Sequence, residues 1–193
     1  MFQKHRKLFI ALIVIFAIPV LVFLCCDITI TKVDENGETE METVPETVDL
    51  LDVSALELFD TGKGLKIKMS PDMSEERTGE LSVYYFAEGL MVSVKKIPFE
   101  ELSQEGTADA NSSIEDYIQI IEDANENIKF TLDSYGNPST TYPAENDGVE
   151  MIYYVTVRKG SDAFWMINFA GLEEEKDIRI PQFEIWGSTI ELK

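Results

Sequence analysis

The stretch VEMIYYVTVRKGSDAFWMINFAGL, residues 149–172, decides the fold of this chain. It reads as two β-strands, residues 149–158 and 163–172, joined by a short turn. Each strand is apolar on both faces, because neighbouring side chains such as Tyr153 and Tyr154 point to opposite sides of a strand. A strand with two apolar faces lies in the middle of a sheet that is covered on both sides.

Further strands and one helix are expected before this hairpin. Residues 65–69 alternate between apolar and polar side chains, and residues 81–87 and 90–97 read as another hairpin. A helix is expected to begin at Ser113, whose side chain can cap it, with Asp116 three residues later. The apolar residues that share one face of this helix are Ile114, Tyr117, Ile118 and Ile121.

The C-terminal segment is expected to supply the cover of the second sheet face. Pro181 can open a helix that contains Phe183 and Trp186, and residues 188–192 then close the domain. The sequence therefore predicts an α+β domain, an antiparallel β-sheet flanked by helices on both faces, preceded by one N-terminal transmembrane helix.

The order of these patterns resembles the PsbP-like domains. The resemblance spans about residues 60–192 and rests on five stretches, residues 64–71, 92–94, 113–117, the hairpin with 153–154 and 164–167, and 183–190. It implies a PsbP-like α/β/α sandwich, the fold shared by the Ran-binding and DcrB-type relatives, in a membrane-anchored bacterial member. It also implies docking on other proteins, and no family site matches residue by residue.

The N-terminal region predicts a membrane anchor. Residues 8–26 carry no charge and, at 1.5 Å per residue, span about 28 Å, close to the thickness of the hydrocarbon core. The basic residues of the tip, residues 1–7, keep that side cytoplasmic and place the rest outside. We expect an acidic disordered stalk over residues 27–57 and the extracytoplasmic domain over residues 58–193.

Two other interpretations of the apolar segment stay open. A lipoprotein signal would attach lipid at Cys25 or Cys26, but it requires small residues before the cysteine, and Val22, Phe23 and Leu24 stand there. A cleaved signal peptide has a shorter apolar core and a small-residue cleavage site. All three interpretations place residues 27–193 outside the cytoplasm.

The charge of the exported part restricts its partners. Residues 27–193 carry 13 basic and 36 acidic side chains, a formal charge of −23. This surface repels nucleic acid, whose binding depends on clustered Lys and Arg. We therefore expect no nucleic-acid partner and a protein partner, of unknown identity, with a basic contact surface.

The residue types available outside the membrane exclude several kinds of active site. Cys25 and Cys26 are the only cysteines, and His5 is the only histidine. The exported part therefore has no thiol nucleophile, no histidine-based triad and no Cys or His metal site. We expect no catalysis, no cofactor and no metal.

One triplet resembles a catalytic motif. Asp60, Thr61 and Gly62 match the active-site triplet of aspartic proteases, in which two carboxylates share a proton. The chain has one copy, followed by Lys63, so we interpret the triplet as a turn.

The turn-rich stretch of residues 134–147 is the candidate partner-binding loop. It has no strong periodicity, and long loops without structure of their own are often functional. Its candidate contact residues are Tyr135, Asn137, Tyr142 and Asn146. The favoured function is an interaction or accessory module of the bacterial cell envelope, a single-pass membrane protein with its C-terminal domain extracytoplasmic.

The alternative function is an extracellular sensor or carrier that binds a small molecule. Its pocket would be lined by aromatic residues, although aromatic side chains on strands more often belong to the core. The residues in question are Tyr84, Tyr85, Tyr153, Tyr154, Trp165 and Trp186.

Overall fold

The computed structural model describes residues 52–193, apart from the side chains of Arg77 and Thr78. The predicted tip and membrane segment, and the predicted stalk up to residue 51, lie outside the described residues. Within the described part, no helix is long and apolar enough to span a membrane. Residues 52–57, which we assigned to the end of the stalk, contain a 3₁₀ turn and the first residue of a strand.

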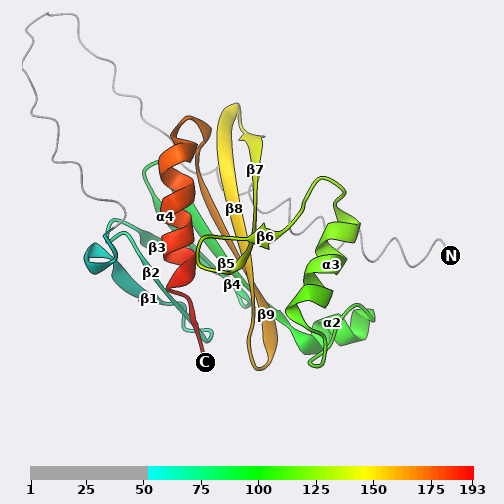
Figure 1. Ribbon diagram of the computed structural model, residues 1–193. Coiled ribbons are helices and arrows are strands. Elements are labelled where there is room, and N and C mark those ends of the chain that lie inside the picture. Colours follow the sequence, from blue (N-terminus) through cyan, green and yellow to red (C-terminus); the bar gives the residue numbers. More distant parts are fainter. Residues whose placement is uncertain (1–51) are drawn as a thin grey trace, which may run out of the picture.

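The described residues form two antiparallel sheets and three α-helices (Figure 1). In chain order the elements are η2 (Val53–Ala55), β1 (Glu57–Asp60), β2 (Leu65–Met69), β3 (Ser74–Thr78), β4 (Ser82–Ala87), β5 (Leu90–Pro98), α2 (Phe99–Glu105), α3 (Ile114–Ala124), β6 (Thr131–Leu132), β7 (Pro138–Asn146), β8 (Val149–Lys159), β9 (Ala163–Leu172), η3 (Glu173–Glu175), α4 (Lys176–Ser188) and β10 (Glu191–Leu192). The main sheet has the order β3-β4-β5-β9-β8-β7-β6, and the small sheet has the order β1-β2-β10.

The hairpin of β8 and β9 lies inside the main sheet, as its two apolar faces predict. Tyr154 is paired with Phe169, and β5 and β7 flank the hairpin on its two sides. Seven consecutive residues of β8 and nine of β9 are buried. Two faces therefore need covers, here called the α4 face, to which Tyr154 belongs, and the α3 face, to which its neighbour Val155 belongs.

Helix α4 and the small sheet cover the α4 face. Phe183 and Trp186 of α4 lie against Phe169 of β9, with ring centroids 5.5 and 6.3 Å apart. Leu65, Ile67 and Met69 of β2 belong to the same core cluster and are fully buried. The apolar residues of the alternating pattern predicted for this strand therefore point into the core, and the polar residues between them point away from it.

Helices α2 and α3 cover one end of the α3 face. Tyr117 of α3 stacks on Phe164 of β9 with ring centroids 4.3 Å apart, and Phe99 of α2 meets the same ring edge-on at 5.1 Å. The predicted cap is confirmed, because Ser113 Oγ accepts a bond from the Asp116 N–H at 3.0 Å while the Asp116 carboxylate accepts one from the Ser113 N–H at 2.8 Å.

The faces of α3 and the start of α4 differ from the predictions in detail. Ile118, which we assigned to the buried face of α3, is only half-buried, whereas Tyr117 and Ile121 are buried. Helix α4 begins at Lys176, so Pro181 does not open it but lies inside it. Because proline has no N–H, the Asp177 carbonyl, four residues before Pro181, receives no helical hydrogen bond. Both residues are exposed, so water can replace the missing bond.

Replacing Phe183 by Ala should destabilise the domain strongly. The Phe183 side chain is fully buried between α4 and the main sheet, and such truncations cost about 3–5 kcal/mol of unfolding free energy. Ile178→Ala on the same helix is the control, because Ile178 is 55% exposed and its truncation should cost under about 0.5 kcal/mol. Thermal unfolding followed by circular dichroism compares the two variants, and equal melting temperatures would refute this packing.

Candidate functional site

The predicted loop over residues 134–147 is wrong in its larger part. Most of it is strand β7, which pairs with β8 from Ser139 to Asn146. The β-branched Thr140 and Thr141 favour a strand, and Pro143 is tolerated because β6 borders β7 only at Pro138 and Ser139, which leaves the rest of β7 as an edge of the described sheet.

The remaining part of the stretch is a turn held by one carboxylate. Asp133 accepts hydrogen bonds from the backbone N–H groups of Tyr135 at 2.9 Å and Asn137 at 2.7 Å, and from the Asn137 side-chain amide at 3.1 Å. The backbone closes the turn as well, since the Asp133 N–H donates to the Asn137 carbonyl and the Gly136 N–H donates to the Asp133 carbonyl. Residues 133–137 are called the Asp133 turn below.

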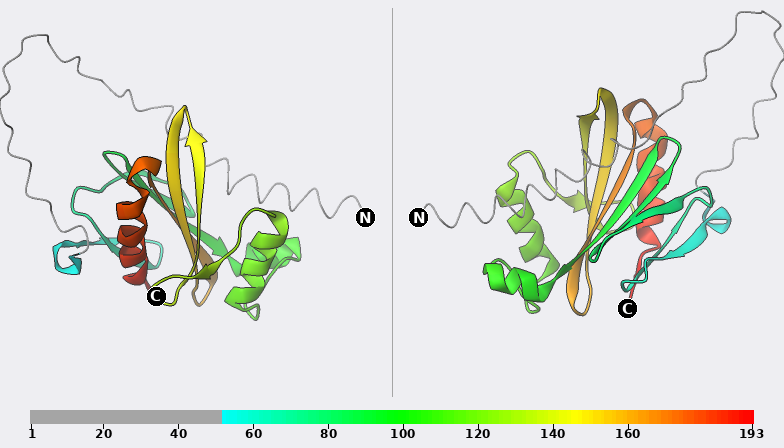
Figure 2. Two further views of the ribbon diagram at one scale, coloured as in Figure 1. Left: turned by 45° about the horizontal axis from the view of Figure 1, so that its top comes forward. Right: turned by 180° about the vertical axis from the view of Figure 1, so that it is seen from behind.

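A core tyrosine fixes this turn to the main sheet. The Tyr154 hydroxyl, on the α4 face of β8, donates to Asp133 Oδ2 at 2.7 Å. The Tyr154 ring is fully buried and tilted against Phe169, so the hydroxyl is held in place by the packed core. Arg158 lies near this pair and donates to the Gly187 carbonyl at the end of α4 at 3.1 Å. In Figure 1 and in the left view of Figure 2, the segment between α3 and β7 passes close to the C-terminal end of α4.

The ionised form of Asp133 holds the turn together. Burial alone would raise the pKa of Asp133, but the hydrogen bonds from Tyr154, Asn137 and Tyr135 outweigh it and lower the pKa below its usual value. Burial, together with the bond and the negative charge of Asp133, raises the pKa of Tyr154. The tyrosine therefore stays a neutral donor and the aspartate a charged acceptor at neutral pH.

The Asp133 turn presents two exposed apolar side chains. Tyr135 is 53% exposed, and Leu132, which immediately precedes the turn, is 72% exposed. A tyrosine on a rigid backbone loses little conformational entropy when a partner covers it, and such residues often dominate binding energies. Leu132 was not among the predicted contact residues, although an apolar residue directly before a D-S-Y-G-N-P turn could have been recognised.

The four predicted contact residues do not form one surface. Tyr135 and Asn137 belong to the Asp133 turn, tied to the α4 face, and Asn137 serves to close that turn. Tyr142 stacks on Tyr153 on the α3 face, with ring centroids 5.3 Å apart, and Asn146 follows it in β7 and is 5% exposed. The structure therefore divides the set between opposite faces of the main sheet.

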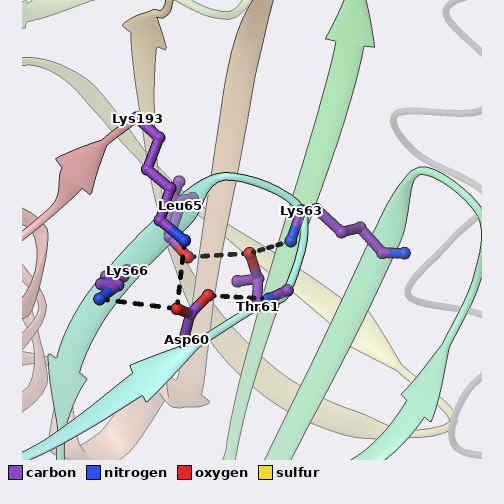
Figure 3. Close-up of polar contacts among 7 residues, drawn as sticks. Asp60, Thr61, Lys63, Leu65, Lys66 and Lys193 are labelled. Carbon is purple, nitrogen blue, oxygen red and sulfur yellow. Dashed lines mark hydrogen bonds and ion pairs between the residues drawn. The ribbon is translucent and has the colours of Figure 1, made fainter.

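The Asp60 triplet is a turn, as we interpreted it (Figure 3). The Gly62 N–H donates to the Asp60 carboxylate at 2.9 Å, and this bond, with the charges of Lys193 and Lys66, lowers the pKa of Asp60. The Thr61 hydroxyl donates to the Leu65 carbonyl at 2.8 Å and closes the connection between β1 and β2. These side chains stabilise the local backbone.

The aromatic residues considered for a ligand pocket are confirmed as core, since all six are at most 8% exposed. A small hollow lies beside them on the α3 face, lined by Ser82, Tyr84, Ser93, Val94, Lys95, Met166 and Asn168. Its volume is about 10 Å³, room for about one water molecule, whereas small-molecule sites usually have about 300–1,000 Å³. The carrier function stays a hypothesis that no feature of the described residues favours.

Comparison with known proteins shows similarity of fold. No family model and no curated protein matches the sequence. A structure from Bacteroides thetaiotaomicron matches 72% of this chain with a TM-score of 0.50 and 10% identity, and this chain spans 48% of that protein.

Two further solved structures carry the names to which the sequence resemblance led. The Ran-binding protein Mog1p of Saccharomyces cerevisiae matches 71% of this chain and 95% of its own, with a TM-score of 0.45 and 11% identity. The cyanobacterial PsbP of Synechocystis matches 81% of this chain and 98% of its own, with a TM-score of 0.46 and 11% identity. Both structures are matched over nearly their whole length, at a TM-score below 0.5.

Removing the charge of Asp133 should destabilise the protein in a pH-dependent way. Asp133→Asn should cost about 1–3 kcal/mol of unfolding free energy at pH 7, because a charged acceptor of several hydrogen bonds is lost. A carboxyl whose pKa is lowered by folding stabilises the protein above its unfolded pKa and stops doing so as the pH falls through the folded value. The difference between wild type and variant should therefore shrink below about pH 4.

Two tyrosine variants provide the control for this prediction. Tyr154→Phe should lose about 1 kcal/mol, because it removes the donor to Asp133. Tyr85→Phe should lose nothing, because the Tyr85 hydroxyl is buried without a hydrogen-bond partner within residues 52–193 and burial raises its pKa to about 12. Urea unfolding at several pH values measures all three variants, and a pH-independent loss for Asp133→Asn would contradict the proposed role of its charge.

Proposed function

We propose that this protein is a membrane-anchored, extracytoplasmic interaction module of the bacterial cell envelope that does no chemistry. The observation that carries the proposal is the Asp133 turn, a backbone fixed by one carboxylate that presents Leu132 and Tyr135 to solvent. An exposed apolar pair on a rigid turn suits docking, because little entropy is lost when it is covered.

The charge of the domain supports a basic partner. The acidic side chains of residues 27–193 outnumber the basic ones by 36 to 13, so a basic contact surface would be drawn to the turn and oriented by the field. Electrostatic attraction of this kind raises association rates and weakens as salt shortens the screening length to about 8 Å at 0.15 M.

The sequence supports the membrane anchor and the absence of catalysis. Residues 8–26 are apolar and follow a basic tip, which favours a single-pass protein with the domain outside. Residues 27–193 contain no Cys and no His, so thiol nucleophiles and histidine-based catalytic groups are missing from the exported part.

Mutating the turn should abolish partner capture without unfolding the domain. The tagged full-length chain is used to capture proteins from detergent-solubilised membranes of the cells that produce it, and captured proteins are identified by mass spectrometry. Leu132→Ser with Tyr135→Ser should lose the partner, and capture by wild type should weaken as salt rises from about 0.05 to 0.5 M. The matched control is Val53→Ser with Leu58→Ser, a pair of similar exposure, 45% and 48%.

The outcome distinguishes specific binding through the turn from non-specific binding to exposed apolar residues. Capture that survives in the turn variant, or that the control variant loses to the same extent, would contradict docking through Leu132 and Tyr135. Capture that is insensitive to salt would contradict the electrostatic part of the proposal.

The topology is tested by labelling with a membrane-impermeant maleimide. Cys25 and Cys26 are first replaced by Ser, so that only the introduced thiol can react. Ser188 is exposed at the end of α4, and Ser188→Cys in intact, wall-stripped cells should react, because the proposal places residues 27–193 outside. Gln3→Cys in the tip should react only after the membrane is permeabilised. If the tip, and not position 188, is labelled in intact cells, the proposed orientation is wrong and the domain lies in the cytoplasm.

A further inference from the structure

The α3 face of the main sheet is covered by helices at one end only. Helices α2 and α3 pack over the part of the sheet around Val155 and Phe164, and in the view from behind the helix at the opposite end is α4, which lies on the far side of the strands (Figure 2). At that end lies a separate apolar cluster, called the open cluster below, whose five members are each at most 8% exposed, namely Tyr84, Met91, Met151, Tyr153 and Ala170.

The side chains of the open cluster cover one another but leave an apolar rim. Partly buried apolar residues pack against it, and these are Phe86, Tyr142, Ala144 and Leu172. Val149 lies two residues before Met151 in β8, hence on the same face, and is 42% exposed. Methionine and aromatic side chains at one surface can adapt to the shape of an incoming apolar partner.

A buried amide without hydrogen bonds lies beside the open cluster. Asn146 follows Ala144 by two residues in β7 and therefore points to the α3 face. It is 5% exposed, and neither its Nδ2 nor its Oδ1 has a hydrogen-bond partner in the described part of the chain. The Oδ1 of Asn168, on the same face of β9, is also buried without a partner among the residues that the structure describes. Unpaired buried amides destabilise a fold, so a group that completes their bonds would bind here favourably.

Acidic side chains surround this end of the sheet. Glu88 lies in the turn between β4 and β5, Asp147 lies in the turn between β7 and β8, and Glu174 follows the end of β9, all three exposed. Glu145 and Glu150 are directly opposite one another on β7 and β8, but they alternate with Ala144 and Met151 and therefore point to the α4 face rather than to the open cluster. The two cations of η3 and α4 at this end are already paired, Lys176 with Glu173 and Arg179 with Glu175.

We propose that the open cluster docks an amphipathic helix of a partner protein, with basic residues along the margins of its apolar face. A helix is the usual cover of an apolar sheet face, and here helices cover only half of it. The acidic margin selects against an acidic occupant, which disfavours both the acidic residues 33–52 of this chain and a second copy placed face to face. The surface is on the other face of the sheet from the Asp133 turn, so either proposal can fail without the other.

Photo-crosslinking identifies what occupies the open cluster. The full-length chain, with Phe86 replaced by p-benzoyl-phenylalanine, is placed in nanodiscs of zwitterionic lipid and irradiated with a synthetic amphipathic helix of Leu and Lys. The expected product is an adduct with this peptide, and the corresponding Leu and Glu helix should give none. A crosslink to residues 1–51 of the same chain, a crosslinked dimer, equal adducts with both peptides or no adduct would each overturn the proposal.

Affinity measurements with matched variants test the same surface independently. The fluorescence anisotropy of the labelled Leu and Lys helix is measured in identical nanodiscs, with the signal of empty nanodiscs subtracted. Val149→Arg should weaken binding about tenfold or more, because it inserts a like charge into the apolar contact, whereas Ile178→Arg, at an exposed apolar position of α4, should leave it unchanged.

The acidic margin is tested by neutralisation. Glu88→Gln with Asp147→Asn should weaken binding about 2- to 30-fold, the range for two exposed ion pairs, and Asn suits the positive φ of 49° at position 147. Glu115→Gln with Glu126→Gln, two exposed acidic positions of α3 and the turn after it, should have no effect. Unchanged affinity in the Val149 and Glu88/Asp147 variants, or equal losses in their controls, would overturn the proposal.

Discussion

The whole domain depends on a hairpin that is apolar on both faces. Strands β8 and β9 cannot leave either face in water, so one cover must form on each side of the sheet. Helix α4 and the small sheet supply one cover, and α2 and α3 supply the other. The cover on the α4 face comes from both ends of the described chain, β1 and β2 on one side and α4 and β10 on the other, and the Lys193 N–H bonds the Gly64 carbonyl at 2.9 Å.

The central hairpin also positions the features to which we assign function. Tyr154 has its ring in the core and its hydroxyl at the edge of the α4 face, where it binds Asp133 and thereby holds the turn that carries Tyr135. One residue earlier, Tyr153 points to the other face and stacks on Tyr142 beside the open cluster. The alternation of two neighbouring tyrosines in one strand thus connects the core to two separate surfaces.

Local signals in the sequence predicted the parts of the fold that depend on neighbouring residues. The hairpin of β8 and β9 and the cap of α3 at Ser113 follow from periodicity and from side-chain chemistry, and both are confirmed. Residues 134–147 were misread, because polar Thr and Pro residues look like a loop until a partner strand is known, and only pairing with β8 makes them β7. The predicted helix start at Pro181 was wrong for a similar reason. The preceding 3₁₀ turn η3 continues directly into α4, so the helix begins before the proline.

The candidate surfaces were less predictable than the fold because exposure is a property of the assembled structure. Nothing local distinguishes Leu132, 72% exposed, from Ile128, 7% exposed, until α3 and the main sheet are in place. The same holds for Asn146, an ordinary turn residue in the sequence, whose side-chain amide is buried at the end of β7 without a hydrogen-bond partner among the described residues. The α4 face is complete, with its aromatic rings in mutual contact, whereas the α3 face has a helix over one half and unpaired amides and acidic margins around the other. The amides of Asn146 and Asn168 thus lie on the half-covered face, where a second protein can complete their bonds, whereas the Tyr85 hydroxyl and the Trp186 N–H, which also lack partners among the described residues, are enclosed on the other face.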